Sequence, residues 1–194
     1  MRLLLALAVS ALFVACGTKG PVRGTPEDIA ALAITLHRLS PQVDGTEAQR
    51  AAQLSYATTH QLAVAYQITD SPLIHNALVN AGRKPRGLCY HWAEDLEARL
   101  KAEGFETLEI TRAIANSDSA ILIDHSTAVI TAKGATMHQG VVIDPWRYGG
   151  KLFWSPIAQD TRYDWKPRAQ VLREKGRIRY VQRTEGSLAP LPLD

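Results

Sequence analysis

The hydrophobic pattern of this chain changes its period near Gly104, and that change most limits the folds open to it. Before Gly104 the apolar residues recur at helical spacing, whereas afterwards they alternate or form short β-branched runs such as Ile121–Ala132. Helices followed by strands, with no long helix between successive strands, favour an α+β domain over a parallel α/β sheet. We therefore expect N-terminal helices and a core helix packed on an antiparallel sheet.

Capping residues, prolines and glycines set the expected limits of these elements. Helices are expected at about residues 26–39, 46–69, 72–81 and 88–103. Strands are expected at about residues 105–115, 121–132, 137–146, 151–154 and 177–183, with one further helix near 167–175.

The N-terminal segment has the features of an export signal. Arg2 precedes an apolar run, residues 3–15, that is too short to cross a membrane comfortably, and Cys16 follows a small residue. The segment resembles a bacterial lipobox, in which the cysteine is lipidated and becomes the mature N-terminus. An ordinary cleaved signal peptide beside a bystander cysteine is the alternative.

The expected organisation is a signal peptide (1–15), a lipidated Cys16 with a Pro/Gly-rich tether (16–26), one domain (27–185) and a C-terminal tail (186–194). A lipid on Cys16 would anchor the protein to a membrane without spanning it. The residue after the cysteine is Gly17 and not an acidic residue. By resemblance to bacterial lipoproteins, this favours an anchor in the outer membrane, with the domain facing the periplasm.

Composition argues against several classes of function. The formal net charge is +3, and removing residues 1–15 leaves +2, which is too small to suggest nucleic acid as a partner. The chain lacks a cysteine pair and a helical HExxH motif, so a zinc site is not expected. We expect no metal and no organic cofactor.

Three residues in the body of the chain supply the parts of a thiol nucleophile and its base. Cys89 is the lone cysteine of the expected domain, and it begins a helix after a Gly-containing loop, where helix amides favour a thiolate. His125 and Asp144 lie in consecutive expected strands, which would bring them together in a hairpin. We expect the helix of Cys89 to pack on the face that carries His125. Each residue also has an ordinary interpretation: a buried thiol, a core histidine and a turn-forming aspartate.

The run Gly87-Leu-Cys-Tyr-His-Trp-Ala, with His125 36 residues after Cys89 and Val-Ile-Asp144-Pro 19 residues further on, resembles the transglutaminase-like superfamily. The spacing is closest to that of bacterial transglutaminase-like cysteine proteinases. The resemblance implies a papain/transglutaminase-like fold and a catalytic triad of Cys89, His125 and Asp144. It covers about residues 87–154.

The resulting hypothesis is an envelope-anchored thiol hydrolase that cleaves a peptide or amide bond through a Cys89 thioester. Its partner would be a protein or peptide substrate, or an envelope polymer. Acyl transfer to an amine on the same triad and a non-catalytic binding or scaffold lipoprotein remain alternatives. The Cys89 amide is the expected first oxyanion donor, and the candidates for the second are Tyr56, His60 and Gln61.

Overall fold

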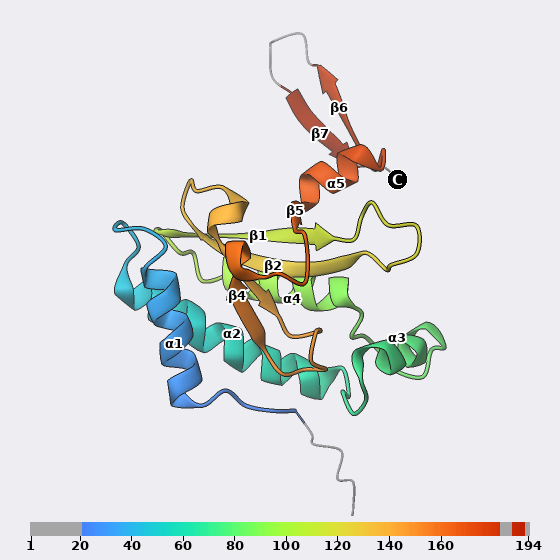
Figure 1. The fold of residues 1–194 in the computed structure, drawn as a ribbon, viewed down its shortest axis with the longest axis horizontal. Helices are drawn as coiled ribbons and strands as arrows, with labels where there is room; N and C mark the ends of the chain where they lie inside the picture. Colours follow the sequence, from blue (N-terminus) through green and yellow to red (C-terminus); the bar gives the residue numbers. More distant parts are fainter. Residues whose placement is uncertain (1–20, 183–187, 193–194) are drawn as a thin grey trace, which may run out of the picture.

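The computed structural model describes residues 21–182 and 188–192, which adopt the predicted α+β fold (Figure 1). The α-helices of this part are α1 (Pro26–His37), α2 (Gly45–Ala65), α3 (Pro72–Asn80), α4 (Cys89–Lys101) and α5 (Arg168–Glu174). The described residues also form two single 3₁₀ turns, η1 (Met137–Gln139) and η2 (Ile157–Gln159). The predicted leader, Cys16 and the start of the tether lie outside the described residues.

The main sheet has the strand order β4-β3-β2-β1-β5, and all of its pairs are antiparallel. Its strands are β1 (Leu108–Ala115), β2 (His125–Ala132), β3 (Val141–Asp144), β4 (Phe153–Pro156) and β5 (Lys166–Pro167). A separate hairpin joins β6 (Ile178–Gln182) to β7 (Leu188–Pro192) beyond α5 (Figure 1).

Helices α1, α2 and α4 cover one face of the sheet (Figure 1). Leu36, Leu96 and Ile130 belong to the core that these helices form with the strands. The opposite face carries a smaller core in which Trp165 packs on Val129. Strand alternation therefore sends neighbouring β2 residues into two different environments.

Residues 137–139, expected in a strand, form η1, and β5 was not expected. Two further segments also differ from the sequence-based expectations. Residues 121–124 form no strand, because Asn116 turns the chain with a φ of 63° and the β1–β2 ladder ends at the pair Ala115–His125. At the C-terminus, Leu188–Pro192 was expected to be part of a tail, yet it pairs with β6 to form β7.

Among residues 21–182 and 188–192, none of the helices combines the length and the hydrophobicity needed to cross a bilayer.

Candidate active site

The loop before α4 is held so that the helix begins at Cys89. Gly87 has a φ of 124°, and a Cβ there would lie 2.4 Å from His75 Nε2, so only glycine fits. His91 Nδ1 accepts the N–H groups of Gly87 at 3.2 Å and Leu88 at 3.3 Å. Burial and the nearby Arg86 charge lower the pKa of His91, which keeps the ring neutral and able to accept.

The sequence analysis did not identify this capping role of His91. The signal was its position three residues after Leu88, where a side-chain acceptor can reach back to the amides that precede a helix.

Cys89 is the first residue of α4 and is 7% exposed. Its thiol donates to the carbonyl oxygen of Asp124, with Sγ 3.5 Å from that oxygen. Within the described part of the chain, the Cys89 N–H has no hydrogen-bond acceptor. This first amide of a helix is therefore free to bind a developing oxyanion.

His125 and Asp144 form a buried pair. The register Ala128–Ile143 continues to place Asp144 opposite Thr127, so His125 reaches the carboxylate diagonally across the β2–β3 pair. Nε2 of the imidazole lies 2.7 Å from Asp144 Oδ2. The second ring nitrogen, Nδ1, is buried and has no hydrogen-bond partner among the described residues.

The surroundings of His125 favour its charged form. Burial lowers the pKa of His125, but the hydrogen bond to Asp144 and the nearby Cys89 sulfur outweigh burial and raise the pKa to about 9. In this arrangement the thiol bonds to Asp124 rather than to Nδ1. The two groups are neighbours, and a change of the Cys89 side-chain rotamer is needed to join them.

The expectation that α4 packs on the face carrying His125 is wrong. His125 alternates with Thr127 and Val129 on the Trp165 side of the sheet, whereas α4 packs on the other side. Cys89 is still a neighbour of the imidazole, because each residue is the first of its element. The site lies at the end of the sheet, where α4 and β2 both begin.

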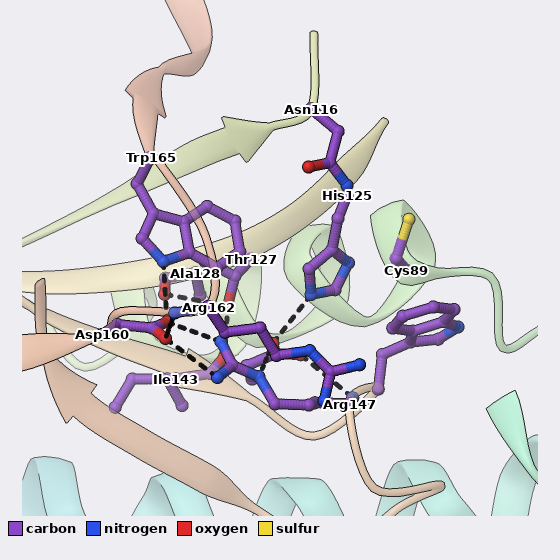
Figure 2. A network of polar contacts seen from close by, with 12 residues as sticks. Cys89, Asn116, His125, Thr127, Ala128, Ile143, Arg147, Asp160, Arg162 and Trp165 are labelled. Atoms are coloured by element: carbon purple, nitrogen blue, oxygen red, sulfur yellow. Dashed lines mark hydrogen bonds and ion pairs between the residues drawn. The ribbon is translucent and has the colours of Figure 1, made fainter. Parts of the chain in front are cut away.

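Asp144 is held by a buried arginine that the sequence analysis did not single out. Arg147 Nε donates to Asp144 Oδ2 at 3.0 Å, and its two terminal nitrogens bind Asp160 at 3.1 and 2.6 Å (Figure 2). Trp165 Nε1 donates to Asp160 Oδ2 at 2.9 Å. Burial lowers the pKa of Arg147 and raises that of Asp160, but their pairing reverses both effects, so both groups stay charged.

Aromatic rings enclose the imidazole. The ring centroids of Trp146, Tyr163 and Trp165 lie 4.7, 4.8 and 5.3 Å from that of His125. These rings leave the imidazole few orientations and limit the approach of water from the sheet side.

Two hollows meet at Cys89, one on each side of the start of β2. The first, about 490 Å³ in volume, contains His125 and is bordered by Trp146, Tyr163 and the residues 121–123 of the β1–β2 loop. Ile121 in this loop is 92% exposed, so the first hollow has an apolar rim open to solvent. The second hollow, about 630 Å³ in volume, lies on the Ser126 side.

The candidates for a second oxyanion donor do not lie at this site. Tyr56, His60 and Gln61 border neither hollow, and the Tyr56 hydroxyl instead accepts the indole N–H of Trp154. The structure therefore does not support any of these three candidates as the second oxyanion donor. Among the described residues, no three His, Cys, Asp or Glu side chains gather as a possible metal site.

No protein-family model, curated protein or solved structure matches the chain.

Proposed function

We propose that this protein is a thiol hydrolase of the transglutaminase-like type that cleaves a peptide or amide bond, with Cys89 as nucleophile, His125 as base and then acid, and Asp144 as the orienting group. The observation that carries the proposal is the buried His125–Asp144 pair, whose imidazole has an unbonded Nδ1 and borders the same hollow as Cys89.

The reaction begins from a Cys89 thiolate paired with the His125 imidazolium, a pair that forms when the thiol proton moves to Nδ1, and the thiolate sulfur attacks the carbonyl carbon. A C–S bond forms, and the carbonyl electrons move to oxygen, which the Cys89 amide stabilises. The imidazolium then gives its proton to the departing amine as the C–N bond breaks, which leaves a thioester. Water attacks the thioester with His125 as base, and the acid and the free thiol are released.

The test is labelling with a panel of thiol-reactive peptide probes, comparing the wild type with Cys89→Ala. The wild type should label at Cys89 with a preference among the peptides, and Cys89→Ala should not label. Equal, slow labelling by all probes, unchanged by His125→Gln, would favour a binding or scaffold protein on the same fold.

Acyl transfer is the alternative reaction at the same site. Any peptide that is cleaved should be incubated with the protein and a fluorescent primary amine, and the products should be identified by mass spectrometry. A dominant amide adduct would identify a transferase, whereas a free acid identifies a hydrolase.

We also propose that Cys16 is lipidated and anchors the domain to the cell envelope. The expected location is the outer membrane, with the domain facing the periplasm. The lipobox-like sequence supports this proposal. Protein expressed in a bacterial host should fractionate with membranes, and Cys16→Ser should release it or leave the signal uncut. Soluble wild-type protein without acyl groups by intact mass would refute it.

A further inference from the structure

The second hollow differs in chemistry from the first. Three arginines border it, together with Cys89 itself: Arg112, Arg168 and Arg177. The first hollow has the aliphatic side chains of residues 121–123 and the rings of Trp146 and Tyr163 on its border, together with Arg147 and Arg162. Arg147 is paired with Asp144 and Asp160. Cys89 therefore lies between a hollow with an apolar rim and a hollow bordered by three arginines.

Two of these arginines have no partner within the described residues. Arg112 is neutralised by Glu97, with Nε 2.7 Å from the carboxylate. Neither Arg168 nor Arg177 makes a side-chain hydrogen bond or an ion pair with a described residue. Arg168 is half-buried, and burial and the Arg112 charge lower its pKa, although Glu97 and Glu94 act in the opposite direction.

The acidic groups that border the second hollow already have partners. Asp124 forms an ion pair with Lys175, and Glu94 lies 3.8 Å from the Arg86 guanidinium. A half-buried guanidinium without a counterion is unfavourable unless a ligand supplies one. The hollow thus has unmatched positive charge beside the thiol.

We infer that the second hollow binds a carboxylate of the substrate, held by Arg168 and Arg177, so that this protein acts on acidic peptides. That the bound carboxylate belongs to a peptide substrate rests on the proposed function. The carboxylate comes either from an Asp or Glu side chain near the scissile bond or from a free peptide C-terminus.

The test compares two alkylating agents that share a leaving group and differ in charge, iodoacetate and iodoacetamide. Both agents react with the same Cys89 thiol, so the intrinsic reactivity of the thiol cancels when the two rates are divided. Because the His125 imidazolium also attracts iodoacetate, the ratio is compared between variants rather than judged in the wild type alone.

Arg168→Gln should lower the iodoacetate-to-iodoacetamide ratio about three- to tenfold, as expected for one charge removed within a few ångströms of the reagent. Arg177→Gln should lower it further, and Arg168→Lys should restore most of it. The matched control is Arg38→Gln, which removes an exposed charge after α1 and should leave the ratio unchanged.

A ratio within about twofold of wild type in the Arg168→Gln, Arg177→Gln double variant would overturn the inference. So would an equal fall in Arg38→Gln. These outcomes are distinct from failure of the proposed function, which shows as slow iodoacetamide labelling that His125→Gln does not change.

A competition experiment distinguishes the two sources of the carboxylate. Acetyl-Ala-Glu-Ala-amide, acetyl-Ala-Ala-Ala with a free C-terminus, and neutral acetyl-Ala-Gln-Ala-amide are each added before iodoacetamide. One acidic peptide should protect Cys89 better than the neutral peptide, and Arg168→Gln should remove that advantage. Equal protection by all three peptides at millimolar concentration would count against carboxylate binding.

Discussion

His125 uses its two ring nitrogens for different purposes. Nε2 is committed to Asp144, and the buried Nδ1 has no hydrogen-bond partner among the described residues. His75 also has one bonded nitrogen and an unbonded buried Nδ1, so this pattern alone does not mark a site. His125 differs because Asp144 holds its other nitrogen and Cys89 is close enough to help raise its pKa.

The raised pKa of His125 links stability to pH. Its pKa rises from 6.5 in the unfolded chain to about 9 in the folded one, so its contribution is complete below about pH 6.5 and is lost as pH rises toward 9. The loss should be a few kcal/mol, at about 1.4 kcal/mol for each pKa unit.

Urea unfolding between pH 6 and 10 measures this effect, with His125→Gln as the matched variant, since glutamine can still donate to Asp144. Both proteins contain the same thiol, so the difference between their slopes of unfolding free energy against pH reports the contribution of His125. Parallel pH profiles would contradict the assignment.

Asp144→Asn tests the orienting role. The amide keeps the shape but cannot stabilise the imidazolium or select the same tautomer, and the loss in a comparable triad is about 10⁴-fold in rate. Labelling by the best peptide probe should fall by at least about tenfold. A rate equal to wild type, with circular dichroism unchanged, would remove Asp144 from the mechanism.

At the scale of elements, the N-terminus of α4 determines where Cys89, the proposed nucleophile, lies. Gly87 makes the turn, His91 caps the two preceding amides, and Cys89 takes the first helical position. The strand β2 begins at the same end of the sheet, which brings His125 to the thiol from the other side.

His91→Ala should destabilise the fold by about 1–2 kcal/mol, because two amides lose their acceptor. His91→Gln should retain most of the stability, since glutamine at this position can accept from the same amides. Urea unfolding at pH 7 measures both variants. Equal stability of His91→Ala and wild type would show that the cap is not needed.

The same residue gives the protein an acid sensitivity. The folded-state pKa of His91 is lowered, so its stabilisation is present above about pH 6.5 and is lost as pH falls through the folded value. Wild type should lose more stability than His91→Gln between pH 7 and pH 5.

At the scale of the whole molecule, Arg147 joins the site to the second core. It connects the end of β3 with the segment between η2 and β5, and its guanidinium lies 3.8 Å from the ring centre of Phe153. The orientation of the imidazole therefore depends on packing that surrounds Asp160 and Trp165.

Arg147→Met should destabilise the protein by about 3–5 kcal/mol, because it leaves the buried Asp160 without a cation and Asp144 with His125 as its remaining one. The control is Arg162→Met, which changes an exposed arginine in the segment between η2 and β5 and should cost less than about 1 kcal/mol. Thermal and urea unfolding should distinguish them. Similar stabilities of the two variants would show that the buried network contributes little.

The sequence by itself determined the class of the fold and suggested Cys89, His125 and Asp144 as the residues of a site. Hydrophobic period, glycines and capping residues act over a few positions, so they could place α1–α4 and most strands within a few residues. The lone Cys89 and the strand-borne His125 and Asp144 could be recognised because their residue types and order suffice to suggest the chemistry.

Tertiary structure alone decided how those residues meet. Strand register and the exit of the chain at Asn116 put His125 on the face opposite α4, which the local pattern did not show. The ion pairs of Arg147 and the unpaired state of Arg168 depend on residues brought together from distant positions. Burial and pairing of charges arise from the whole packed chain, so no short stretch of sequence could have specified them.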